Sequence, residues 1–103
     1  MDVVFHAHNA VISDRLKQRA AHGIEKIAQR LSRAVAATVR FTQDGPIRRV
    51  ELLLHAPRHR HLIAAGEARY YGPALRSALL HLEAQVAREK RDVKGAASRL
   101  ARA

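Results

Sequence analysis

Three apolar stretches in the middle of the chain, separated only by tight turns, constrain the fold more than any other feature. They span residues 34–42, 47–56 and 62–68. In the first stretch Val39 and Phe41 alternate with polar residues, a period of two that is typical of a half-buried strand. Residues 43–46, with Asp-Gly and a proline, supply the first turn, and Pro57 begins the second. The region therefore predicts a meander of three strands with one apolar face to be covered.

Two amphipathic helices and one more strand are expected to complete this fold. Residues 2–8 alternate as a short strand, and Ser13 is a good N-cap for a helix that runs to about Leu31. A second helix is expected to open at Gly72 and Pro73 and to end at 91–94. The expected buried positions are Leu16, Ala20, Ile24, Ile27 and Leu31 in the first helix and Leu75, Ala78, Leu79, Leu82 and Val86 in the second. The order β-α-β-β-β-α predicts an α+β fold, a four-stranded sheet with two helices packed on one face.

Length and composition are typical of a single domain. The chain has 103 residues, 48% of them hydrophobic and 27% charged, so we expect one domain at 1–94 and a short flexible basic tail at 95–103. The absence of cysteine excludes disulfides, thiolate metal sites and cysteine catalysis. No apolar run is long enough to cross a membrane, and the N-terminus lacks the basic start of a secretory signal, so a cytoplasmic protein is expected.

Charge is the strongest global signal. Lys and Arg number 19 against 9 Asp and Glu, giving a net charge of +10, so the chain should attract polyanions such as nucleic acid. The alternative is an arginine-rich composition that only reflects a GC-rich genome. The aromatic residues are Phe5, Phe41, Tyr70 and Tyr71, and both phenylalanines fall in apolar strand patterns. We therefore expect contacts to phosphates and to nucleic-acid shape, not base stacking.

Three segments carry a distinctive combination of motifs. They are NAVISDRLKQRAAHGIEKIAQRL at 9–31, VELLLHAP at 50–57 and LEAQVAREKRDVK at 82–94. In this order and spacing, over about residues 2–94, they resemble the bacterial ribosome hibernation-promoting factor family, which includes the ribosome-associated translation inhibitor and is also known as sigma-factor modulation protein. Lys26 falls where that family has lysine. The chain departs from the family pattern at Gly23, where lysine is common, and at Ala84 and Ala87, where basic residues are frequent.

The resemblance implies a fold, a partner and a mode of action. Family members bind ribosomal RNA of the small ribosomal subunit in the channel where messenger and transfer RNA meet, which blocks initiation and keeps ribosomes idle but intact under stress. Long members carry a C-terminal dimerisation domain, whereas this chain resembles a short form, so we expect a monomer off the ribosome. No cofactor, small-molecule substrate or membrane is implied.

Basic residues of the two helices are the candidate RNA contacts, and a histidine-rich turn adds two more. The set is Lys26, Arg88, Lys90, Arg91, Lys94, Arg15, Arg19, Arg30, Arg58 and Arg60. Arg88 and Lys90 match basic positions of the family. On the first helix, residues 15, 19, 22, 26 and 30 form a basic stripe beside the apolar one. The alternative interpretation is a solvated helix end whose cations stabilise the helix dipole.

Metal binding and catalysis are not expected. His6 and His8 are two residues apart, as are His59 and His61, so each pair would share a strand face, but neither has a third ligand at a recognised spacing. No serine or acid lies in a catalytic motif, and no glycine-rich phosphate loop is present. The sequence therefore predicts a protein that is not an enzyme.

Two other functions remain open. A protein-binding regulator, in the older sigma-factor sense, would use an apolar strip formed by Leu80, Ala84 and Ala87 on the second helix. A general double-stranded RNA binder would share the α-β-β-β-α part of the element order, although the glycine-lysine-rich helix start of that module is absent.

Overall fold

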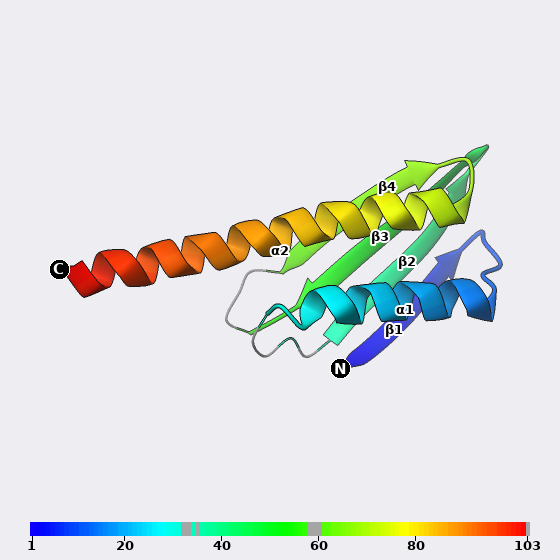
Figure 1. The fold of residues 1–103 in the computed structure, drawn as a ribbon. Helices are drawn as coiled ribbons and strands as arrows, with labels where there is room; N and C mark the ends of the chain where they lie inside the picture. Colours follow the sequence, from blue (N-terminus) through cyan, green and yellow to red (C-terminus); the bar gives the residue numbers. More distant parts are fainter. Residues whose placement is uncertain (32–33, 35, 58–60, 103) are drawn as a thin grey trace.

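The chain forms a four-stranded sheet that two helices cover on one face (Figure 1). The computed structural model describes residues 1–31, 34, 36–57 and 61–102, with the side chains of the second helix described as far as Glu89. The elements are β1 (Asp2–His8), α1 (Asp14–Ala28), β2 (Ala36–Asp44), β3 (Ile47–His55), β4 (Leu62–Ala68) and α2 (Tyr71–Arg102). The predicted element order and α+β class are confirmed.

The sheet combines a meander with one parallel crossover. Its strand order is β1-β2-β3-β4, with β2, β3 and β4 antiparallel and β1 parallel to β2. Because parallel neighbours need a crossover connection, α1 joins β1 to β2 across one face of the sheet. The meander then returns the chain to the same face, where α2 packs on β4 and β3. The two helices run side by side in the same direction (Figure 1).

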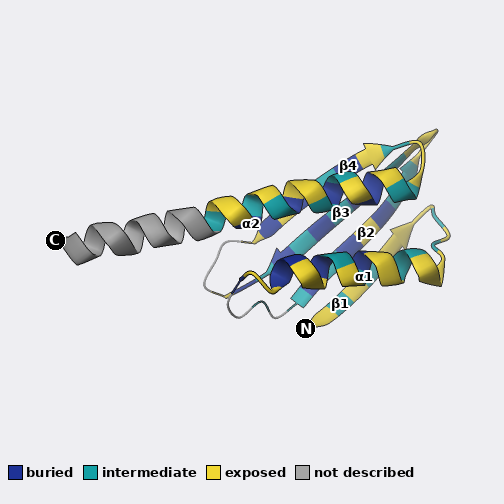
Figure 2. Ribbon diagram, viewed as in Figure 1, coloured by how far each residue is buried: buried dark blue, intermediate teal, exposed yellow. Residues whose placement is uncertain are grey.

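The core lies between the helices and a single apolar face of the sheet (Figure 2). On β3 the side chains of Val50, Leu52 and Leu54 are fully buried, while the residues between them are half exposed. The predicted buried positions of both helices belong to this core, with Leu16 and Leu79 only partly buried at its margin. Because only one face of the sheet is buried, both helices lie on the same side of it.

The end of α1 and the turn between β2 and β3 differ from the prediction because of their backbone hydrogen bonds. The N-cap at Ser13 is confirmed, since its hydroxyl accepts a hydrogen bond from the amide of Leu16 at 3.2 Å. The far end of α1 lies at Ala28 instead of about Leu31, because the amide of Leu31 bonds to the carbonyl of Ala28 in a tighter i to i−3 turn. The β2–β3 ladder extends to Asp44, which leaves a two-residue turn whose glycine has a φ of 58°.

The second helix is longer than predicted. We expected it to end at 91–94, ahead of Gly95, but α2 continues to Arg102. One glycine inside a helix costs only about 1 kcal/mol relative to alanine, and the residues that follow, AASRLAR, are mostly good helix formers. Residues 95–102, expected as a flexible tail, are therefore helical backbone continuous with α2.

Gly66 of β4 lets α2 approach the sheet closely. A methyl group added at Gly66 would lie 2.3 Å from the carbonyl oxygen of Ala74 and 2.6 Å from the amide nitrogen of Ala78. Both atoms belong to the backbone of α2, so no side-chain movement could relieve the clash. The absence of a side chain at this position therefore sets the distance between α2 and β4.

Two polar side chains of α2 also cover the outer edge of β4. A ring nitrogen of His81 lies 2.7 Å from the carbonyl oxygen of Ala65, and the Gln85 side-chain amide donates to the carbonyl of Ile63 at 2.5 Å. These carbonyls point away from β3 and have no ladder partner, because β4 is an edge strand. The two contacts therefore fix the lateral position of α2 along that edge.

Replacing Gly66 by alanine should destabilise the protein by about 3 kcal/mol, because α2 must move away from β4. Gly23→Ala is the matched control: its new methyl group would come closest to the terminal carbons of Leu79, which can rotate. The gain in helix propensity of about 1 kcal/mol should offset that adjustment. Urea denaturation followed by circular dichroism measures both effects. Equal stability changes for the two variants would contradict the close-contact account.

Candidate nucleic-acid interface

Basic side chains of α1 border a groove between the two helices. Near the middle of this groove the helices pack at Gly23, where an added methyl group would lie 2.7 Å from Cδ1 of Leu79. A hollow of about 370 Å³ on one side is lined by Ser13, Arg15, Leu16, Arg19, Tyr71 and Gly72. A hollow of about 240 Å³ on the other side is lined by Gly23, Lys26, Ile27, Arg30, Leu79 and Glu83. We call the two hollows together the interhelical groove.

The groove gathers four of the predicted contact residues. Arg15 and Arg19 line its first hollow, and Lys26 and Arg30 line its second. All four side chains are exposed and belong to the basic stripe predicted on the first helix. That stripe flanks the apolar stripe, and the apolar stripe faces the sheet, so the basic residues are left beside the neighbouring helix.

An acidic side chain of α2 reaches across the groove. Arg30 pairs with Glu83 of α2 at 3.0 Å, and both side chains are about half exposed. An exposed pair of this kind contributes roughly 0–1 kcal/mol to stability, so its main effect here is to orient the two side chains. Glu83 also offsets one positive charge in the second hollow.

Arg76 is a basic residue that the sequence analysis did not select. It is exposed, and it lies four residues after Gly72 and three before Leu79, both of which line the groove. Helical periodicity therefore places Arg76 on the side of α2 that faces α1. This spacing was present in the sequence, but it had no meaning until the packing showed which side of α2 meets α1.

The remaining candidates lie elsewhere. Arg88 is exposed, but it follows Glu83 by five residues, which places it about 140° around α2 from the groove. Lys90, Arg91 and Lys94 lie in the helical backbone of α2, and their side chains lie outside the described residues. Arg58 and Arg60 also lie outside the described residues. Among the candidates whose side chains the structure describes, those of the first-helix stripe are therefore brought together and Arg88 is not.

The open face of the sheet has charges that pair with one another. Arg49 contacts Glu67 at 2.8 Å and Glu51 at 3.6 Å, and Arg40 lies 4.0 Å from Glu51. Two arginines and two glutamates thus alternate across neighbouring strands. Because these pairs neutralise one another, this face attracts polyanions less than the groove does.

Tyr71 closes one end of the groove. Its ring packs edge-on against Phe41 at a centroid distance of 5.7 Å, and the Arg48 guanidinium lies 5.7 Å from the ring centroid. Burial raises the pKa of the Tyr71 hydroxyl, and the charge of Arg48 only partly opposes this shift. The hydroxyl therefore stays protonated at neutral pH and adds no negative charge to the groove.

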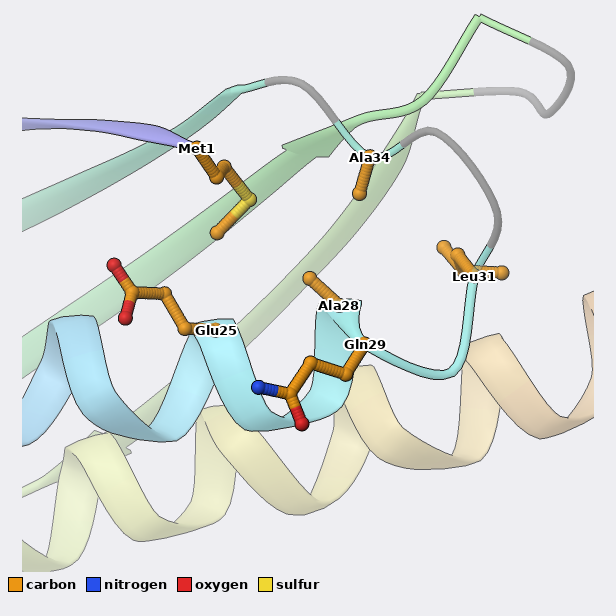
Figure 3. A pocket seen from close by; sticks show the side chains of 6 residues that line it. All are labelled: Met1, Glu25, Ala28, Gln29, Leu31 and Ala34. Atoms are coloured by element: carbon orange, nitrogen blue, oxygen red, sulfur yellow. The ribbon is translucent and has the colours of Figure 1, made fainter.

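A separate hollow beside the N-terminus does not extend the groove. It has a volume of about 370 Å³ and is lined by Met1, Glu25, Ala28, Gln29, Leu31 and Ala34 (Figure 3). The side chain of Met1 points across it toward the end of α1 (Figure 3). Among the described side chains that line it, the charged one is the carboxylate of Glu25, which does not attract a polyanion.

Two further kinds of feature are absent from the part of the chain that the structure describes. No group of three His, Cys, Asp or Glu residues in it could hold a metal ion, and none of its polar or charged residues is buried. Within the same residues, no helix has the length and apolar character needed to cross a membrane.

Comparison with known proteins gives a consistent result. The model of the family described as sigma 54 modulation protein / S30EA ribosomal protein matches residues 3–94. The N-terminal domain of Protein Y from Thermus thermophilus has a TM-score of 0.76 at 20% identity, covering 85% of this chain and 98% of that one. A ribosomal subunit interface protein from Coxiella burnetii has a TM-score of 0.74 at 17% identity, covering 88% and 99%. No curated protein sequence matches the chain.

Removing charge from the groove should weaken polyanion binding more than removing the same charge from the sheet. Arg15→Gln/Arg19→Gln and Arg40→Gln/Arg49→Gln both lose two positive charges, but the sheet arginines already lie beside glutamates. We expect the groove variant to elute from heparin at clearly lower salt than the sheet variant. Equal elution of the two variants would show that net charge alone governs binding.

Proposed function

This chain belongs to the sigma 54 modulation protein / S30EA ribosomal protein family, and on that basis we propose that it is a ribosome-associated regulator of translation. It acts in the cytoplasm and without catalysis. It binds ribosomal RNA of the small subunit in the channel for messenger and transfer RNA, where its presence blocks initiation and keeps idle ribosomes intact under stress. The similar structure from Coxiella burnetii is that of a ribosomal subunit interface protein, which supports the ribosome as partner.

The observation that carries the proposal is the row of basic side chains along the interhelical groove. From Arg15 to Lys26 the row extends about 16 Å along α1, at 1.5 Å per residue, and Arg30 follows in the turn after the helix. A row of this length can contact several successive phosphates of one RNA strand. Phosphate contacts of this kind position a protein on RNA without reading its sequence, as expected from the small number of aromatic residues.

The second helix is proposed to lengthen this contact surface. Arg76 adds a cation from the α2 side of the groove, while α2 continues past the sheet (Figure 1). Lys90 follows Glu83 by seven residues, or two helical turns, and so continues the groove stripe along α2. Arg88, Arg91 and Lys94 are proposed as further RNA contacts on the later part of α2, with Arg88 on a different side of the helix from the groove.

A protein-binding role is the second candidate, and one exposed feature favours it. Leu80 on α2 is 57% exposed, and Ala84 and Ala87 beside it are also exposed. These residues form an apolar strip on a helix that is otherwise rich in charge. A partner protein would bury this strip, whereas an RNA partner would leave it uncovered.

Co-sedimentation with ribosomes at increasing salt tests the proposal. Binding should weaken steeply with salt, and Arg19→Glu/Lys26→Glu should lower the affinity at least tenfold, because two phosphate contacts become repulsive. For this variant, the slope of log affinity against log salt concentration should become less steep by about 0.7–0.9 for each lost phosphate contact. Arg40→Glu/Arg49→Glu, on the open sheet face, is the matched control and should retain most of the binding.

Two outcomes would overturn the proposal. Failure of the wild-type protein to sediment with ribosomes at low salt would exclude ribosome binding. Retained binding by the groove variant, together with loss in the sheet variant, would place the contact on the other face. Capture of a protein partner that resists nuclease and requires Leu80 would favour the second candidate.

A further inference from the structure

Two histidines on neighbouring strands point their ring nitrogens at each other. His55 ends β3 and His61 precedes β4, and the antiparallel register that pairs Leu54 with Leu62 places the two histidines opposite one another. Nδ1 of His55 lies 2.7 Å from Nε2 of His61, and the rings meet edge to face with centroids 4.4 Å apart. Sequence spacing suggested His59 and His61 as a pair, whereas the structure pairs residues six apart across a hairpin.

Only two chemical arrangements make this contact favourable. The two nitrogens can share one proton, with one ring as donor and the other as acceptor. Alternatively, both can present a lone pair to the same cation, which then takes the place of the shared proton. A protonated nitrogen on each ring would instead set two N–H groups against one another.

The observed distance is close to that of two nitrogen ligands on one metal ion. With metal–nitrogen bonds of about 2.0–2.1 Å, adjacent ligands lie roughly 2.9 Å apart in square-planar geometry and 3.3 Å apart in tetrahedral geometry. The pair therefore needs to open by only a few tenths of an ångström. His61 is exposed and can make this adjustment, while half-buried His55 is held by the end of β3.

We propose that His55 and His61 form a binding site for a divalent transition-metal ion. Imidazole suits copper, nickel and zinc, whereas magnesium and calcium prefer oxygen ligands. Cu²⁺ should bind most tightly, because it lies at the peak of the affinity order for nitrogen ligands. The bound ion links the end of β3 to the start of β4, and water or a further ligand occupies its other positions.

This site is independent of the proposed ribosome-binding function. The two histidines lie on the strand ends, and neither lines the interhelical groove. The described residues contain no third histidine or carboxylate within reach of the pair. Among the described residues the ion therefore has two protein ligands, and it remains open to exchange.

Calorimetric titration of the untagged full chain with CuSO₄, NiCl₂ or ZnCl₂ tests the site. We expect one Cu²⁺ to bind with a Kd on the order of 10 µM, and Ni²⁺ and Zn²⁺ to bind more weakly. His55→Ala and His61→Ala should each weaken Cu²⁺ binding at least tenfold. His22→Ala removes an exposed histidine of α1 and should leave the affinity unchanged. Circular dichroism confirms that each variant is folded.

Paramagnetic Cu²⁺ gives a second measurement that does not depend on substitution. At low ratios of metal to protein it should broaden the ring signals of His55 and His61 before those of His6, His8 and His22. Three results would each overturn the proposal: no binding at millimolar Cu²⁺, unchanged affinity in both pair variants, or first broadening at the other histidines. If Cu²⁺ does not bind, a shared proton alone accounts for the contact between the two histidines.

Discussion

The sheet has one apolar face, and this constraint determines the rest of the molecule. A single face must receive both helices, so α1 and α2 lie side by side on it and run in the same direction. Each helix turns its apolar stripe toward the sheet. The basic residues that flank the stripe of α1 are then brought against α2, where they border the interhelical groove. The groove is thus a direct consequence of how the core is buried.

Residues 82–85, which begin the motif at 82–94, act mainly by positioning α2. Leu82 is fully buried in the core, Glu83 pairs with Arg30 across the groove, and Gln85 donates to the carbonyl of Ile63 on the edge strand. Leu82 and Gln85 thus hold α2 on the sheet and along β4, while Glu83 orients its side chain toward α1.

Sequence patterns could predict the fold, because burial and chain reversal leave local signals. The apolar alternation of the strands, the cap at Ser13 and the helical stripes all reappear in the structure. The end of α2 could not be predicted in this way, since a lone Gly95 is too weak a signal to stop a helix. Two further features could not be predicted either. The position of Arg76 at the interhelical groove and the contact between His55 and His61 both depend on packing between distant segments.

In the proposed function the helix layer, and not the open sheet face, faces ribosomal RNA. The chain contains no cysteine, so a single cysteine can carry a tethered iron chelate that cleaves nearby RNA through hydroxyl radicals. His22→Cys on α1 and His6→Cys on β1 place the probe at exposed positions on the two faces. The account predicts strong, localised cleavage of small-subunit RNA from position 22 and little from position 6. Stronger cleavage from position 6 would contradict it.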